Sequence, residues 1–358
     1  MDVSPVYLAV KVNVANLKSN FFLIVKFMSK ILLLVISVLV ALNLQSAPTT
    51  AVLFSTNPSI VKVHVANKDG NHGVGSGVVV AKDYIVTNCH VIADAQGVHV
   101  EKYGVSYPPE ALIANWKNDL CILKFKYTEL KPAVLGTTEN LQYETNVFTK
   151  SYGGNSTRPQ SSFGNIKGIF NFNGFKVIQS SASFTMGASG GGLFNDKGEL
   201  LGITTVYLNP RGKAYYFSMS VEMIKSMLKN GDEISVTTQS ERPFWDNPEE
   251  SQPFFMQVAG PIKNKMWGKL ENISQNWLTQ EPDSDESNFY YALSQYYLNN
   301  LTSAQKVFKK IIKQNKRHTE SYLYLYKIAK KSDMKKEMQQ YKKLTLSLDE
   351  TLIIEIDE

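Results

Sequence analysis

The stretch Gly187-Ala188-Ser189-Gly190-Gly191-Gly192-Leu193-Phe194 sets one serine among glycines. A serine becomes a nucleophile for acyl transfer when a base takes its proton and fixed N–H donors stabilise the oxyanion that forms. Glycines let the backbone fold so tightly that two N–H groups face one point. The pattern therefore predicts Ser189 as a nucleophile, with the N–H groups of Gly187 and Ser189 as the oxyanion donors.

Two upstream segments supply the other groups that this chemistry needs. In Thr87-Asn88-Cys89-His90-Val91, which follows the strand-like run from Gly75, His90 is the candidate general base. In Asn118-Asp119-Leu120-Cys121-Ile122-Leu123, Asp119 is the candidate carboxylate that would fix the tautomer of the base and stabilise the imidazolium. The order along the chain is His, Asp, Ser, which differs from the order in subtilisins and α/β-hydrolases.

At these residues the chain resembles the trypsin-like (chymotrypsin-fold) serine proteases, in particular the bacterial HtrA-like type. The resemblance covers about residues 59–228, just under half of the 358 residues. It implies a double β-barrel and peptide-bond hydrolysis by His90, Asp119 and Ser189, and it implies no cofactor and no metal. The sequence departs from the family at Ala188, where these proteases usually carry Asn, Asp or Ser. Helical sequence, rather than a PDZ-type domain, follows the protease-like part.

The same resemblance places the base of the substrate pocket six residues before the nucleophile, at Ser183, beside Phe184. Trypsin-like cleavage after Lys or Arg usually needs a carboxylate there, and no acidic residue lies between Lys176 and Phe194. The pocket is therefore predicted to favour small or medium apolar side chains. If this stretch is only a barrel wall, shape alone decides the specificity.

The pattern of apolar residues divides the mature chain into a β part and a helical part. Short β-branched runs with Gly- and Asn-rich connections continue from residue 59 to about 206, which is typical of an antiparallel sandwich or barrel. Residues 231–261 contain four Pro and no sustained period, so they predict a linker or a wrapping loop. We therefore expect a multi-domain chain with an all-β double-barrel domain at 48–230, a linker at 231–265 and an all-α domain at 266–358. Domains on the two sides of a linker should fold separately.

Residues 290–311 read as two helices joined by a turn at Asn299-Asn300. Their aromatic pair, with Ala304 and Phe308 four residues apart, resembles a degenerate tetratricopeptide repeat. Residues 320–331 and 333–346 resemble a second pair, and a plain helical bundle is the alternative. Residues 301–345 carry 12 Lys and one Arg against one Asp and two Glu. This charge indicates either a solvated face or a basic groove for an acidic peptide, a partner protein or an anionic surface, and a secreted chain would seldom meet nucleic acid.

The start of the chain has the features of a secretory signal peptide. Residues 31–42 are apolar apart from one serine, Lys26 and Lys30 precede them, and Ala47 is a small residue near the expected cleavage site. We assign residues 1–47 to the signal region, with Met28 as a candidate true start, and predict a periplasmic or secreted protein. An uncleaved membrane anchor and a buried helix are the alternatives.

Cys89 and Cys121 are the two cysteines of the chain. If His90 and Asp119 come within hydrogen-bonding distance, their neighbours Cys89 and Cys121 also come close, and an oxidising compartment would join them in a disulfide. Two buried free thiols are the alternative.

The composition is that of a globular protein, because 43% of the residues are hydrophobic and 20% are charged. Two functions remain open at this stage. One is a secreted serine endopeptidase acting on proteins or peptides, whose helical domain recruits substrate or a partner. The other is a catalytically silent protease fold that supports a partner-binding helical domain.

Overall fold

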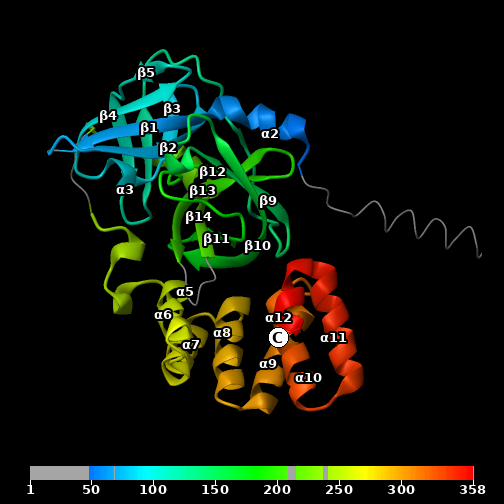
Figure 1. Cartoon of the computed structure of the whole chain (residues 1–358). Helices are drawn as coiled ribbons and strands as arrows, with labels where there is room; N and C mark the ends of the chain where they lie inside the picture. Colours follow the sequence, from blue (N-terminus) through cyan, green and yellow to red (C-terminus); the bar gives the residue numbers. More distant parts are fainter. Residues whose placement is uncertain (1–47, 68, 209–214, 237–240, 358) are drawn as a thin grey trace, which may run out of the picture. The chain divides into compact units, whose positions relative to one another are not determined.

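The computed structural model describes residues 48–67, 69–208, 215–236 and 241–357, so the predicted signal region lies outside the described residues. In the described part, two sheets come first along the chain and a set of helices follows (Figure 1). The first sheet has the strand order β5-β4-β1-β2-β3-β7-β6, and its printed pairings are all antiparallel. Its strands are β1 (Ile60–Asn67), β2 (His72–Ala81), β3 (Tyr84–Thr87), β4 (Ala95–Lys102), β5 (Val105–Tyr107), β6 (Ala111–Asn115) and β7 (Leu120–Lys124).

The second sheet closes on itself. Its strand order is β12-β9-β10-β11-β14-β13-β8, and β12 also pairs with β13, so six of its strands form a closed barrel. The strands are β8 (Val134–Leu135), β9 (Asn146–Ser151), β10 (Gln160–Phe172), β11 (Phe175–Ser180), β12 (Gly192–Asn195), β13 (Glu199–Leu208) and β14 (Tyr215–Ser220). The all-β double barrel that the short β-branched runs predict is confirmed.

Short helices connect and flank the strands. They are α2 (Thr50–Thr56), η1 (Asn57–Ser59), α3 (Cys89–Ile92), η2 (Gly153–Asn155) and α4 (Val221–Asn230). The first sheet encloses its own apolar core, because the inward residues of its alternating strands pack together, among them Val61, Val79, Ile85, Leu112 and Leu123.

The C-terminal part is helical, as predicted. It consists of α7 (Trp267–Gln280), α8 (Asp285–Tyr297), α9 (Leu301–Gln314), α10 (Thr319–Lys331), α11 (Lys335–Leu348), η6 (Glu350–Leu352) and α12 (Ile353–Asp357). Helices α8 and α9 pack as one pair and α10 and α11 as the next. No helix in the described ranges has the length and apolar character needed to cross a membrane.

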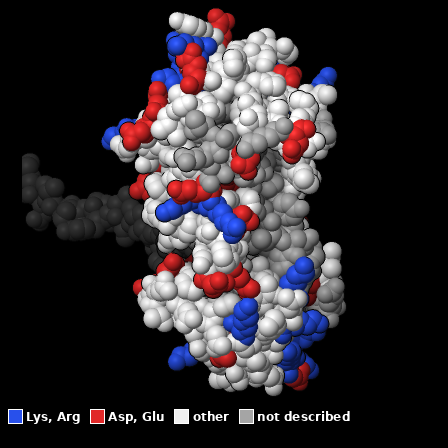
Figure 2. Space-filling view, turned by 90° about the vertical axis from the view of Figure 1, so that its left-hand side faces the viewer, with Lys and Arg blue, Asp and Glu red and all other residues white. Residues whose placement is uncertain are grey.

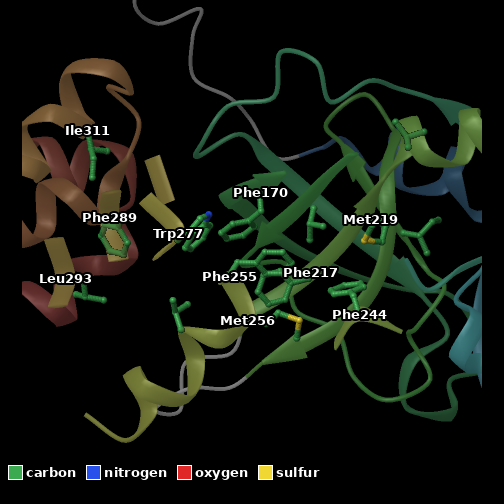
Figure 3. Close-up of a cluster of buried hydrophobic side chains, with 14 of the residues drawn as sticks. Phe170, Phe217, Met219, Phe244, Phe255, Met256, Trp277, Phe289, Leu293 and Ile311 are labelled. Carbon is green, nitrogen blue, oxygen red and sulfur yellow. The ribbon is translucent and has the colours of Figure 1, made fainter. Parts of the chain in front are cut away.

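The stretch 231–265, for which the sequence predicts a linker or a wrapping loop, folds into η4 (Phe244–Asp246), η5 (Glu249–Ser251), α5 (Phe254–Gln257) and α6 (Ala259–Lys263). Phe244 and Phe255 of this stretch are buried against the second barrel (Figure 3). The ring of Phe255 lies 4.7 Å from that of Phe170 and 5.5 Å from that of Phe217. Phe244 packs against Phe172, with 5.0 Å between the ring centroids. These are the contacts of a wrapping loop.

Buried polar groups also join the second barrel to the helices. Glu286 of α8 accepts hydrogen bonds from the Tyr143 hydroxyl and, at 2.9 Å, from the backbone N–H of Ile169 in β10. Lys167 of β10 pairs with Glu144 and with Asp349, at 2.6 Å each. Apolar and polar contacts therefore both connect the two regions that the sequence analysis treats as separate domains.

Candidate active site

His90 and Asp119 lie at the same end of two paired strands. Strands β3 and β7 are antiparallel, with Thr87 opposite Cys121. His90 follows the end of β3 in the short helix α3, and Asp119 comes directly before β7. Because the first residues of one strand face the last residues of its antiparallel neighbour, this register brings the two side chains together.

The Asp119 carboxylate contacts His90 through both of its oxygens. Its Oδ2 lies 2.6 Å from the ring Nδ1 of His90, and its Oδ1 accepts the backbone N–H of the same residue at 2.9 Å. Asp119 is fully buried, whereas 27% of the His90 side chain is exposed. An ionised carboxylate only accepts hydrogen bonds, so Nδ1 must carry the proton of a neutral ring and Nε2 keeps a free lone pair. This arrangement suits a general base.

The backbone around Asp119 is fixed by several contacts. Asp119 has a φ of +56°, a conformation that Asp adopts more readily than most residues. Its carbonyl oxygen accepts the side-chain N–H of Asn88 at 2.9 Å and the backbone N–H of Cys89 at 3.3 Å. A disulfide joins Cys89 to Cys121, with 4.9 Å between the Cα atoms, so the two thiols are not free.

The loop 187–191 that carries Ser189 is held against the β2–β3 hairpin. The backbone N–H of Ser76 donates to the carbonyl of Ser189 at 2.8 Å, and the carbonyl of Ser76 accepts the Thr87 hydroxyl at 2.7 Å. Ser76 thus connects the Ser189 loop to the strand that ends just before His90. Gly190 has a φ of +85°, and a Cβ built there would lie 2.1 Å from the Ser76 oxygen, so glycine is required.

The amides of this loop fall into two groups. Those of Ala188, Gly190 and Gly191 each donate to a backbone carbonyl, at 2.9–3.0 Å. Those of Gly187 and Ser189 have no acceptor among the residues that the structure describes. Two neighbouring free N–H groups are what an oxyanion site offers to a developing negative charge.

Ser189 itself is half-buried, and its hydroxyl makes no hydrogen bond within the described ranges. The structure therefore brings His90 and Asp119 into direct contact, and it holds the Ser189 loop against the same hairpin without a bond between Ser189 and His90. In unliganded enzymes the bond between nucleophile and base often tightens only when substrate binds.

The two predicted pocket residues lie in different surroundings. The Ser183 hydroxyl is exposed and lies 2.8 Å from that of Ser162 in β10. Phe184 is buried and packs edge-on against Tyr216 of β14, with 4.9 Å between the ring centroids. The assignment of Ser183 and Phe184 to the substrate pocket stays a prediction.

Sequence reasoning missed Trp245, which lies in the wrapping loop. Its indole Nε1–H donates to Asp119 Oδ2 at 2.9 Å. Its ring meets the His90 ring edge-on, with 5.2 Å between centroids and an interplanar angle of 90°. No motif marks this tryptophan, because it lies 126 positions beyond Asp119, in a stretch without any period.

Comparison with known proteins finds similarity to peptidases over the part of the chain that carries these residues. Residues 75–203 match the family model described as the trypsin-like peptidase domain. The periplasmic pH-dependent serine endoprotease DegQ of Escherichia coli is 31% identical over 154 residues, which is 39% of this chain and 32% of DegQ. A probable periplasmic serine endoprotease, DegP-like, of Buchnera aphidicola is 29% identical over 187 residues, or 48% of this chain and 37% of that protein. The crystal structure of a protease of M. tuberculosis in its active form superposes with a TM-score of 0.48 at 20% identity, covering 55% of this chain and 92% of that one.

The chain therefore contains a trypsin-like peptidase domain. This part of the chain is similar to the periplasmic serine endoprotease DegQ and to the DegP-like protease. The chain spans about a third of the length of these curated relatives, 32% and 37% respectively.

Proposed function

We propose that this protein is a secreted or periplasmic serine endopeptidase that hydrolyses peptide bonds with Ser189 as nucleophile, His90 as general base and Asp119 as the orienting carboxylate. The contact between His90 Nδ1 and Asp119 Oδ2 at 2.6 Å is the observation that carries the proposal. The trypsin-like peptidase match covers His90, Asp119 and Ser189, which supports the same assignment.

The proposed reaction runs in two halves. Ser189 Oγ attacks the scissile carbonyl while His90 Nε2 takes its proton, and the N–H groups of Gly187 and Ser189 stabilise the oxyanion. The C–N bond then breaks, and His90 gives its proton to the leaving amine, which leaves an ester on Ser189. A water molecule attacks this ester with His90 again as base, and the acid product leaves as the proton returns to Ser189.

The compartment is part of the proposal. A buried disulfide between Cys89 and Cys121 suits an oxidising space, because cytosolic thiols are kept reduced. The curated relatives named above are periplasmic by name. The predicted signal region itself lies outside the described residues.

In this proposal the helical region recruits protein substrate or a partner. Helices α8 and α10 begin at Asp285 and Thr319, and α9 and α11 begin at Leu301 and Lys335, so both offsets are 34 residues. That offset equals the period of tetratricopeptide repeats, which supports the repeat interpretation. On the face shown in Figure 2, Lys and Arg lie over the helices among acidic and uncharged residues.

A test of recruitment compares a large substrate with a small probe. Lys330 and Lys331 are exposed on α10 and stack over Tyr326 and Tyr296. We expect the double variant Lys330→Glu with Lys331→Glu to slow the cleavage of casein severalfold while labelling by a small fluorophosphonate continues at the wild-type rate. Equal rates of casein cleavage by the wild-type protein and the double variant would show that this surface does not recruit substrate.

The test of the enzyme is covalent labelling of Ser189. A fluorophosphonate probe should label the folded wild-type protein, and the variants Ser189→Ala and His90→Ala should remain unlabelled. The variant Ser106→Ala is the matched control, because Ser106 is an exposed serine in β5, outside the proposed triad and the predicted pocket. Folded wild-type protein that is never labelled would favour the silent scaffold instead.

A further inference from the structure

We propose that Trp245 is a positioning residue of this active site, whose indole N–H holds the Asp119 carboxylate in place for His90. The inference rests on the proposed function and extends it to the wrapping loop. It starts from the hydrogen bonds of one buried carboxylate. Asp119 is fully buried, and its side chain accepts three hydrogen bonds within the described residues, two from His90 and one from Trp245.

The origin of these donors matters more than their number. The two bonds from His90 come from the very residue that Asp119 must orient. Trp245 is thus the one donor to this carboxylate, among the described residues, that is independent of His90. Without it, the carboxylate and the imidazole could shift together, because a buried charge needs further partners to hold one geometry.

Trp245 is itself held firmly. The preceding residue, Phe244, donates its backbone N–H to the carbonyl of Lys117 at 3.0 Å, two positions before Asp119. The side chain of Phe244 is buried against Phe172 and Phe255. The carbonyl of Trp245 accepts the Gln252 side-chain N–H at 3.0 Å. These contacts hold the backbone on both sides of the indole, as a positioning group requires.

The same contacts extend toward the helices. Phe255 stacks on Phe170, and Phe170 in turn lies 6.2 Å from Trp277 of α7, measured between ring centroids (Figure 3). The wrapping loop thus connects the helical part to the carboxylate of the proposed triad through packed side chains.

The variant Trp245→Phe tests this role, because it keeps an aromatic ring beside His90 and removes only the N–H donor and the second ring. Labelling by a fluorophosphonate probe is measured at several probe concentrations, which separates the maximal rate from the half-saturating concentration. We expect the maximal rate to fall roughly tenfold or more, as for the loss of a hydrogen bond to a charged group, with an unchanged half-saturating concentration. Trp267→Phe, the same change at a tryptophan that stacks on Tyr297, should label like wild type.

A wild-type maximal rate in Trp245→Phe would overturn the inference, and so would a change confined to the half-saturating concentration. A second measurement does not depend on activity or on the folding of that variant. The indole N–H signal of Trp245 in a nitrogen-15 NMR spectrum should shift, and should exchange faster with solvent, in Asp119→Asn than in wild type, while Ser189→Ala leaves it unchanged. If the indole responds but wild-type protein is never labelled, the enzyme proposal fails; an indole that ignores Asp119→Asn overturns the role of Trp245.

Discussion

Cys89 and Cys121 form a disulfide across the two segments that hold His90 and Asp119. Cys89 is the residue before His90, and Cys121 lies two positions after Asp119. Both sulfur-bearing side chains are buried in the core of the first sheet. The covalent bond therefore adds to the hydrogen bonds that bring base and carboxylate together.

Removing this disulfide should weaken the fold. The bond closes a loop with a sequence separation of 32, which in the chain-entropy model corresponds to about 3–4 kcal/mol. The double variant Cys89→Ala with Cys121→Ala should unfold at a lower urea concentration, and its free energy of unfolding should be lower by about 3–4 kcal/mol. Wild-type protein unfolded without reductant should show no free thiol. Two free thiols per chain, or identical urea curves, would contradict this prediction.

Replacing Gly190 by alanine should disable the Ser189 loop. An added Cβ would lie 2.1 Å from the Ser76 oxygen and 2.4 Å from the Thr87 hydroxyl, and the φ of +85° is unfavourable for alanine. The loop must move, and a displacement of about 1 Å can cost roughly a hundredfold in rate. We expect fluorophosphonate labelling to fall by about that factor. Gly97→Ala is the control, since nothing lies within 4 Å of its added Cβ, and equal labelling of both variants would contradict the argument.

Sequence patterns predicted the protease-like part well because its signals are local. These signals are the glycines around Ser189, the strand-like run before His90 and the one after Asp119, and each is a short pattern that can be recognised in the sequence. The role of Trp245 could not be predicted in this way, since its contact with Asp119 spans 126 positions and depends on how Phe244 and Phe255 pack on the barrel. Separate folding of the two domains stays a prediction. The contacts between them were not predicted, because the groups that make them, such as Glu286, look like ordinary helix-surface residues in the sequence.

Breaking the ion pairs of Lys167 should loosen the helices from the second barrel. Lys167 lies between Glu144 and Asp349, whose side chains are only 3% and 11% exposed. Lys167→Met would leave two buried carboxylates without their cation, which costs about 3 kcal/mol. We expect a matching loss in the free energy of unfolding measured in urea.

Lys126→Met is the matched control for that change. Lys126 pairs with Glu110 at the surface, where the two side chains are 63% and 41% exposed. Exposed pairs of this kind contribute about 0–1 kcal/mol. An equal effect of the two variants would show that the Lys167 pairs do not hold the helices.

His318 should make the helical part sensitive to acid. It is buried between the rings of Tyr143 and Phe289, and its Nδ1 accepts the N–H of Ser321 at 3.3 Å, which caps α10. Burial lowers the pKa of the His318 imidazole below its usual 6.5, although the nearby carboxylates of Glu320 and Asp285 oppose this shift. The folded protein therefore requires the neutral ring.

The direction of the pH effect follows from proton binding. Below about pH 6.5 the unfolded chain protonates His318 while the folded protein does not, so stability falls as the pH falls, by up to about 1.4 kcal/mol per pH unit. Above pH 6.5 both states are neutral at this residue, and the contribution is constant. The variant His318→Asn should keep a capping acceptor for α10 and lose this titration. The free energy of unfolding of both proteins is measured from pH 5 to pH 8. Because both proteins contain the other histidines, the difference between the two curves reports on His318 alone. Parallel curves over this range would contradict the prediction.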